Sequence, residues 1–354
     1  MTCPPVKTVG LIFSKKKKQR SAFSGLEEYA SQHGVQIVHV DLDHAISLQG
    51  KFDLIVHKLT DLIAAATKGQ EDAERQLSNF EQYTKAHPQT IILDPLPDVN
   101  KLMDRRGTFT VLKACLNVHA RTNSHPTEPL FYLPNHICLP NIHTPFSKDL
   151  LAFPILCKRV SACSSEEAHK MTLVPNPNHT DLLGPYYDPD EPVIFQEFIQ
   201  HDGVIFKIYV VDGTPHVQVR PSFKNVTLED NLLHFDSQVV PKAFEQDTQP
   251  PTSTPQMNGT HHTDPIRQAF LTRDVHNVRS AKEAVFDHRK IELITQRLIE
   301  QLNLTFFGFD VLVETGPLHR HFVVDVNYFP SFSNIPDFRE RFVDILLSRL
   351  KTVE

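Results

Sequence analysis

Two carboxylates and an amide occupy two short apolar segments near the end of the sequence. Asp310 interrupts FFGFDVLVE, and HFVVDVNYF contains Asp325 and Asn327 two residues apart. Side chains two apart share one face of a strand, so antiparallel neighbours would bring the three groups together. Such oxygen ligands suit Mg²⁺ that bridges nucleotide phosphates. A solvated polar face is the alternative, although an unpaired buried carboxylate at Asp310 would be costly.

Two isolated lysines precede this acidic pair. Lys158 follows the apolar run LLAFPILC, and Lys207 interrupts VIFKIYVV. A single lysine in a strand pattern usually extends its amine to solvent or pairs with an acid. Two of them in consecutive sheet segments favour phosphate binding, because an ammonium group is a compact charge that suits phosphate oxygens. The combination predicts a nucleotide held between a lysine-bearing sheet and a sheet that binds Mg²⁺.

The first twenty residues are strongly basic. They contain Lys7, Lys15, Lys16, Lys17, Lys18 and Arg20 and no acid. Alone, KKKKQR is typical of a solvated surface run or a localisation signal. Its position directly after the first predicted strand favours an anion-binding site, because ligand loops of open α/β sheets lie there.

The composition excludes several classes of protein. Only 12 of the 354 residues are glycine, and neither G-x-x-x-x-G-K-[ST] nor G-x-G-x-x-G occurs. A P-loop or Rossmann phosphate-binding loop is therefore not expected. The net charge of −6 argues against a nucleic-acid partner. No apolar run is long enough for a membrane span, and five scattered cysteines without a C-x-x-C pair indicate a reducing compartment, so we expect a cytoplasmic protein.

The elements that must position these residues fall into three parts. The first part predicts a parallel α/β layer, with strands at Thr8–Phe13, Val35–Val40, Asp53–His57 and Thr90–Leu93 and helices near 24–33 and 70–86. After a helix at 108–120, closely spaced strands predict an antiparallel sheet: Leu150–Lys158, His169–Leu173, Val193–Ile199, Val204–Val211 and His216–Arg220. The last part predicts helices at Asp287–Leu302 and Phe338–Leu350 around strands at Thr305–Glu314 and His321–Asn327.

These patterns predict three domains. Residues 1–108 form an N-terminal α/β domain, 109–200 a central subdomain and 201–354 a C-terminal subdomain with the metal site. Within the last, residues 241–285 lose periodicity and are rich in Pro, Thr, Gln and His. We expect this segment to be a mobile surface insertion.

The order of these features resembles the ATP-grasp fold and, more narrowly, the inositol-tetrakisphosphate 1-kinase family, also called inositol 1,3,4-trisphosphate 5/6-kinases. The matching motifs span most of the chain: VG-x-x-x-S with its lysines (Val9–Lys18), HKLTD (57–61), AHPQTIILDPLP (86–97), the DR pair (104–105), the CK that ends at 158, VRPSFKN (219–225), FGFD (307–310) and DVNYFP (325–330). HKLTD and LDPLP are specific to that family. The resemblance implies an N-terminal α/β domain in front of two antiparallel α+β subdomains that hold ATP between them.

The resemblance also implies roles for individual residues. Those for ATP are Arg105, Lys158 and Ser222 near the phosphates or neighbouring groups, Gln196, Glu197, Phe198 and Ile199 along the adenine, and Ser237. Asp310, Asp325 and Asn327 would hold Mg²⁺, with two ions expected. The inositol phosphate would bind Lys17, Lys58, His169, Lys207, Arg220, Asn327 and Ser331, and Lys207 and Asp325 would be catalytic. His57 has no assigned role.

Two positions depart from the family pattern. The loop after Lys158 reads RVSACSSEEA (159–168), with two adjacent acids and no glycine, where the family has a glycine-containing loop similar to H-G-T-N-S-H. An acid pair facing ATP would repel its phosphates. Either the loop is directed away from ATP, or the contacts with the phosphates come from Ser161, Ser164 and Ser165. At Ser331 the family has the glycine of F-P-G.

The resemblance implies a Mg²⁺-dependent kinase, a monomer, that transfers a phosphoryl group from ATP to inositol 1,3,4-trisphosphate at its 5 or 6 position, to inositol 3,4,5,6-tetrakisphosphate at its 1 position, or to both. A local basic wall would attract so acidic a substrate to a protein of net charge −6. Two alternatives stay open. One is an ATP-grasp carboxylate–amine ligase, which gives no reason for Lys17, Lys58 and Arg220. The other is a non-catalytic binder of inositol phosphates or nucleotides, motivated by the altered 159–168 loop.

Overall fold

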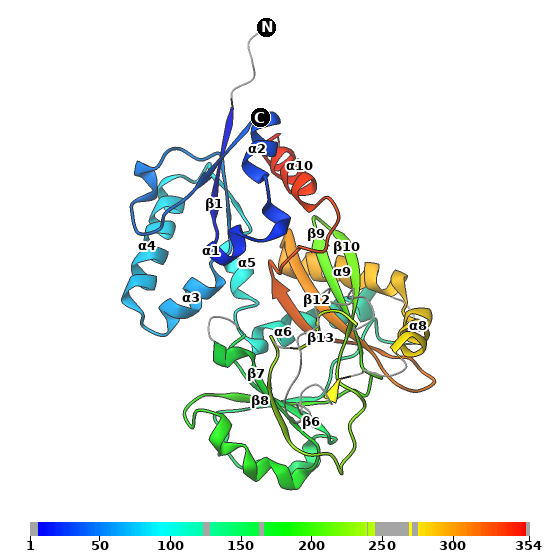
Figure 1. Cartoon of the computed structure of the whole chain (residues 1–354). Helices are drawn as coiled ribbons and strands as arrows, with labels where there is room; N and C mark the ends of the chain where they lie inside the picture. The colour runs from blue at the N-terminus through cyan, green and yellow to red at the C-terminus, as the bar shows by residue number, and fades with distance from the viewer. Residues whose placement is uncertain are drawn as a thin grey trace, which may run out of the picture.

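A computed structural model describes residues 6–122, 128–162, 166–238, 240–244, 269–270 and 275–351. The chain forms three β-sheets with helices around them (Figure 1). No helix within these described ranges is long and apolar enough to cross a membrane.

The N-terminal sheet is parallel, as the sequence predicts, with the strand order β2-β1-β3-β4. Its strands are β1 (Lys7–Ile12), β2 (Val35–His39), β3 (Leu54–His57) and β4 (Ile91–Leu93), and its helices are α1 (Lys15–Lys18), α2 (Leu26–Gln32), α3 (Thr60–Thr67), α4 (Glu71–Ala86) and α5 (Leu96–Asn100). The amphipathic pattern of α4 is the reason it packs here: Phe80 and Tyr83 are buried against the sheet, and the opposite face is polar.

The central sheet is antiparallel, as predicted, with the order β11-β7-β6-β8-β5. The last two strands predicted for it, Val204–Val211 and His216–Arg220, belong instead to the C-terminal sheet. The central sheet follows α6 (Arg105–Thr122) and contains β5 (His136–Leu139), β6 (Ile155–Arg159), β7 (Lys170–Val174), β8 (Val193–Glu197) and β11 (Leu233–Asp236). The predicted strand at Leu150–Lys158 begins only at Ile155, because Pro154 has no N–H to donate to the ladder. Strands β5 and β11 were not predicted.

The C-terminal sheet has the order β10-β9-β12-β13, and all of its pairs are antiparallel. Its elements are β9 (Val204–Val211), β10 (Thr214–Pro221), α8 (Val275–Val285), α9 (His288–Leu302), β12 (Phe306–Val313), β13 (His321–Tyr328) and α10 (Phe338–Lys351). The prediction of a mobile insertion over 241–285 is wrong for α8, which packs Val278 and Val285 against the core. Residues 245–268 and 271–274 of that prediction lie outside the described residues.

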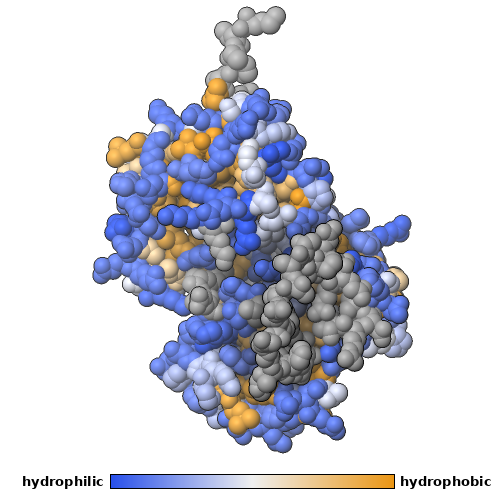
Figure 2. All heavy atoms as spheres, in the orientation of Figure 1, coloured by the Kyte–Doolittle hydropathy of each residue, from blue (hydrophilic) through white to orange (hydrophobic). Residues whose placement is uncertain are grey.

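One apolar core joins the N-terminal and C-terminal sheets, and a second core belongs to the central sheet. The first contains Val9 and Leu11 of β1 together with Phe306 of β12 and Phe342 of α10. Helix α10 lies beside α2 in Figure 1 and contacts it. The face shown in Figure 2 is mostly hydrophilic, with hydrophobic residues visible over the N-terminal domain. The N-terminal and C-terminal sheets are therefore packed as one body, to which the central sheet is added.

Candidate active site between two sheets

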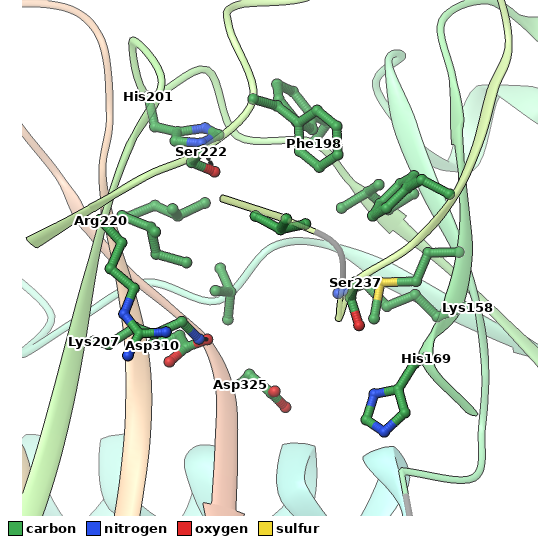
Figure 3. A pocket seen from close by; sticks show the side chains of 18 of the residues that line it. Lys158, His169, Phe198, His201, Lys207, Arg220, Ser222, Ser237, Asp310 and Asp325 are labelled. Atoms are coloured by element: carbon green, nitrogen blue, oxygen red, sulfur yellow. Dashed lines mark hydrogen bonds and ion pairs between the residues drawn. The ribbon is translucent and has the colours of Figure 1, made fainter. Parts of the chain in front are cut away.

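A cavity of about 530 Å³ lies between the central sheet and the C-terminal sheet (Figure 3). Most of the residues that the sequence singled out line it: Arg105, Lys158, His169, Gln196, Glu197, Phe198, Ile199, Lys207, Arg220, Ser222, Ser237, Asp310, Asp325 and Asn327. Lys17, Lys58 and Ser331 do not line it. The roles of these residues stay predictions, whereas their convergence on one cavity is an observation.

The acidic residues lie opposite each other on adjacent strands. Asp310 of β12 is the cross-strand partner of Asp325 of β13, and Asn327 follows two residues later. The amide nitrogen of Asn327 donates to Asp325 Oδ2 at 2.9 Å, which leaves the amide oxygen available as a ligand. Two carboxylates and one amide oxygen fit Mg²⁺, which takes few protein carboxylates and keeps several waters. No group of three or more His, Cys, Asp or Glu side chains suited to a metal occurs among the described residues.

Lys207 of β9 pairs with this acidic group, with 2.5 Å between its Nζ and Asp310 Oδ2. Burial lowers the pKa of Lys207, but the charge and hydrogen bond of Asp310, together with the charges of Asp325 and Tyr209, outweigh burial and hold the pKa above its usual value. Burial also raises the pKa of Asp310, and Asp325 raises it further, although Lys207 opposes both. A cation bound between the two aspartates would relieve this repulsion.

Two cations from other elements reach the same region. Lys158 of β6 donates to Gln196 Oε1 at 3.0 Å, and burial lowers its pKa to about 7. Arg105, at the start of α6, lies 3.6 Å from Asp325 Oδ1 and donates from Nε to Arg159 O. An anionic ligand here would favour the charged form of Lys158.

The predicted adenine segment runs along one side of the cavity. Gln196 lies in β8 between β5 and β6, and the backbone nitrogen of Phe198 donates to Pro154 O at 2.9 Å. Apolar side chains also line the cavity: Leu156, Met171, Ile205, Phe223, Phe235 and Leu312. A slot of this composition suits a flat base with a few polar edge groups.

Four polar residues of the cavity lining were not identified from the sequence as site residues: Arg20, His201, Gln238 and Lys242. Arg20 belongs to the basic KKKKQR segment, but nothing in the sequence distinguishes it from the adjacent lysines. His201 follows the predicted adenine segment by two residues, which is the one signal that could have found it.

Lys17 has a buried ammonium group outside the cavity lining. Its Nζ donates to Phe329 O at 3.1 Å and to Pro330 O at 3.2 Å, and it lies 3.8 Å from the centroid of the Phe329 ring. Phe13 and Phe23 surround it as well. Burial, followed by the nearby charge of Lys58, places the pKa of Lys17 well below its usual value.

One acid of the 159–168 loop, Glu167, is paired with basic neighbours. Glu167 lies 3.2 Å from Arg159 Nη2 and also pairs with Lys170. Arg159 is buried and pairs with Glu191 at 2.8 Å as well. The carboxylate of Glu167 is therefore held by bases of the central sheet. Ser164 and Ser165 lie outside the described residues.

Comparisons with protein families match nearly the whole chain. A model described as the inositol 1,3,4-trisphosphate 5/6-kinase ATP-grasp domain matches residues 134–348, and its pre-ATP-grasp counterpart matches residues 8–99. The chain is 28% identical over 348 residues to an inositol-tetrakisphosphate 1-kinase of Xenopus laevis, covering 96% of this chain and 77% of that protein. It is 28% identical over 353 residues to one of Danio rerio, covering 98% and 79%.

Solved structures share the fold at low sequence identity. A RimK domain ATP-grasp protein of Sphaerobacter thermophilus is 13% identical, with a TM-score of 0.56 and coverage of 96% of this chain and 99% of that chain. A D-alanine–D-alanine ligase of Bacillus anthracis is also 13% identical, with a TM-score of 0.54 and coverage of 98% of each chain. At these identities the likeness concerns the ATP-grasp fold alone.

Proposed function

Because this chain belongs to the inositol 1,3,4-trisphosphate 5/6-kinase family, we propose that it transfers the γ-phosphoryl group of ATP to a hydroxyl of an inositol phosphate. The observation that carries the proposal is the convergence of Asp310, Asp325 and Asn327 on the cavity that Lys158 and Lys207 also line. Facing cations and oxygen ligands match the needs of phosphoryl transfer, in which positioning and charge neutralisation provide most of the catalysis.

Each residue has a role that follows from its place in the cavity. Gln196, Glu197, Phe198 and Ile199 hold the adenine; Arg105 and Lys158 contact the phosphates, and Ser222 and Ser237 contact other parts of ATP. Asp310, Asp325 and Asn327 hold Mg²⁺, which neutralises phosphate charge when bound. Lys207 and Asp325 are the catalytic residues, and the 2.5 Å contact between Lys207 and Asp310 orients the lysine.

The acceptor lies against the remaining basic residues. His169, Lys207 and Arg220 line the cavity with Asn327, and Arg20 adds a further cation. Several positive groups around one opening suit a substrate with several phosphates. The acceptors we propose are inositol 1,3,4-trisphosphate, at its 5 or 6 position, and inositol 3,4,5,6-tetrakisphosphate, at its 1 position. Lys17, Lys58 and Ser331 stay predicted contacts that lie outside the cavity lining.

The direct test is incubation with Mg-ATP and each inositol phosphate, followed by separation of the isomeric products and measurement of ADP. Production of a more highly phosphorylated inositol is expected. ADP formation with amino acids, and not with inositol phosphates, would instead support a carboxylate–amine ligase. Tight binding without ADP formation would support a non-catalytic binder.

We also propose two Mg²⁺ ions per site, a monomer and a cytoplasmic location. The opposed carboxylates of Asp310 and Asp325 support the first. Cys115, Cys138 and Cys157 are free thiols, which supports a reducing compartment. Metal titration of the rate, light scattering and imaging of a tagged chain test the three statements in turn.

A further inference from the structure

His201 and Ser222 form a buried pair at one end of the cavity. His201 lies between β8 and β9 with 1% of its surface exposed, and Ser222 follows β10 with 8% exposed. Figure 3 shows the two side chains together on the side of Phe198, well away from Asp325. Asn225 Oδ1 accepts from the His201 backbone nitrogen at 3.0 Å, and Gly203 O accepts from the Ser222 backbone nitrogen at 2.7 Å. Both residues are therefore fixed at the backbone.

The hydrogen-bond partners of His201 determine which ring nitrogen carries the proton. Nδ1 lies 2.6 Å from Ile199 O, and a carbonyl oxygen only accepts, so Nδ1 is the protonated nitrogen. Burial lowers the pKa of His201 to about 4, so the ring is neutral at pH 7 and Nε2 has no proton. Nε2 lies 2.7 Å from Ser222 Oγ. The Ser222 hydroxyl must donate to Nε2, since Nε2 itself has no hydrogen to give.

The hydrogen bond to His201 determines how the Ser222 hydroxyl can bind a ligand. A serine hydroxyl has one hydrogen and two lone pairs, and here the hydrogen is directed to His201. Ser222 therefore faces the cavity only as an acceptor. Phosphate oxygens of ATP are acceptors too, and two acceptors cannot share a hydrogen bond without a proton between them.

We propose that His201 makes Ser222 an obligate hydrogen-bond acceptor that recognises a donor group of the nucleoside, a ribose hydroxyl or the adenine amino group, and not a phosphate. The inference rests on the proposed function only in taking ATP as the ligand. It narrows the role that the family resemblance gave to Ser222, which included phosphate contact. His201 acts through Ser222 and is a positioning residue.

The distribution of the other groups in the cavity supports this assignment. Phe198 and Phe223, which suit a nucleoside, line the cavity together with Ser222. Asp310 and Lys207, which suit phosphates and their metal, lie away from Ser222 in Figure 3. A nucleotide that spans the cavity would bring its nucleoside, and not its phosphates, to Ser222.

The test measures nucleotide affinity by calorimetry in Mg²⁺ without any inositol phosphate, so it is independent of phosphoryl transfer. The probes are ATP, 2′-deoxy-ATP, 3′-deoxy-ATP and purine riboside triphosphate, which lacks the adenine amino group. In the wild type, one analogue should bind about threefold to tenfold more weakly than ATP, the usual range for one net hydrogen bond. Ser222→Ala should remove that difference, whereas Ser24→Ala, the same deletion at an exposed serine outside the cavity lining, should keep it.

His201→Phe provides the second variant, because it removes the acceptor for the Ser222 hydrogen. The difference in affinity between ATP and the same analogue should become smaller, since the Ser222 hydroxyl is then free to donate. If the analogue still binds more weakly than ATP in both Ser222→Ala and His201→Phe, the proposal is overturned. Equal binding of all four probes by the wild type also overturns it. Failure to bind ATP at all overturns this proposal and the proposed function together.

A direct measurement is independent of nucleotide binding. Nitrogen-15 NMR of the histidine rings should show His201 with a protonated Nδ1 and an unprotonated Nε2 at pH 7. The opposite tautomer would overturn the proposal even if nucleotide affinity changed as expected.

Discussion

At the scale of single residues, Lys17 shows how tertiary packing changes the role of a charged side chain. Its ammonium group lies among Phe13, Phe23 and Phe329 and donates to the carbonyls of Phe329 and Pro330. Phe329 itself has a φ of 43°, an uncommon backbone conformation for a residue other than glycine. Lys17 thus stabilises the turn that follows β13, the strand that carries Asp325 and Asn327.

Lys17→Met should therefore lower the free energy of unfolding by about 1–3 kcal/mol, because the buried carbonyl of Phe329 and the half-buried carbonyl of Pro330 lose their donor. Urea denaturation measures the change. Lys18→Met, one residue away in α1, is the matched control and should have little effect. Unchanged stability with weaker binding of inositol phosphate would instead assign Lys17 to the substrate.

Asp325→Ala should lower phosphoryl transfer by about 100-fold or more, the usual cost of removing a group that stabilises transition-state charge. The fold should remain intact, since the change also removes repulsion between Asp325 and buried Asp310. Initial rates over a range of Mg²⁺ concentrations and a thermal unfolding curve check both statements. A near-normal rate would remove the metal assignment.

The sequence predicted part of the cavity at this scale. The alternation in HFVVDVNYF correctly predicted that the side chains of Asp325 and Asn327 would lie on one face of β13. Asp310 pairs with Asp325 across the two strands. The direction of Lys17 was not predictable, because the rings around it come from both ends of the chain. His201 was missed for a similar reason, since its partner Ser222 lies 21 residues further along the chain.

At the scale of elements, the contact between β9 and β12 depends on Gly308. A Cβ at Gly308 would lie 2.9 Å from Ile208 O and 3.1 Å from Pro330 Cγ. Both atoms belong to segments that position the site, because Lys207 precedes Ile208 and Asn327 lies three residues before Pro330.

Gly308→Ala should therefore separate the two strands, lowering the free energy of unfolding by about 1–3 kcal/mol and the rate of phosphoryl transfer with it. Denaturation and initial-rate measurements on the same preparation check this. Gly184→Ala is the control, because its nearest neighbour would be His143 Cε1 at 3.4 Å, an ordinary contact. Equal behaviour of the two variants would contradict the expectation.

Two of the elements that the sequence missed, both strands, carry little periodicity of their own. Strand β11 is only LHFD, and it is a strand because it pairs with β7. Strand β5 lies within a stretch rich in Pro and His, and its pairing with β8 is decided by tertiary structure. Longer periodic elements such as β9 and α9 were predicted to within one residue.

At the scale of the whole molecule, buried ionisable groups predict loss of stability in mild acid. Burial lowers the pKa of His57, His201 and His321 to about 4. The unfolded chain binds these protons near pH 6.5, so unfolding takes up protons and the free energy of unfolding falls between about pH 6.5 and pH 4. Asp94, with its pKa raised by burial to about 6, and Asp310 act in the opposite sense.

These three histidines, joined in the same sense by His136, His216 and His234, outnumber the two aspartates, so the free energy of unfolding falls as the pH is lowered from about 6.5 toward 5. Urea denaturation at several values between about pH 7 and pH 5 measures this slope. His57→Phe should make it shallower, because one of these histidines is removed. Stability that is constant or rises on acidification would contradict the prediction.

The fold class was predictable because its signals are spread over the chain and agree with one another. The scarcity of glycine excluded P-loop and Rossmann sites, and the structure holds its candidate nucleotide site between two sheets instead. The packing of the N-terminal and C-terminal sheets around one core was not predictable, because members of that core such as Val9 and Phe342 are separated by nearly the full length of the sequence.

The strand order has a consequence for synthesis on the ribosome. Strand β11 completes the central sheet, but β9 and β10 of the C-terminal sheet are translated before it. Strands β9 and β10 in turn need β12 and β13 to complete their sheet, and these two strands are translated after β11. Each sheet therefore stays unfinished while part of the other emerges, and the cavity between them is among the last features of the nascent chain to form.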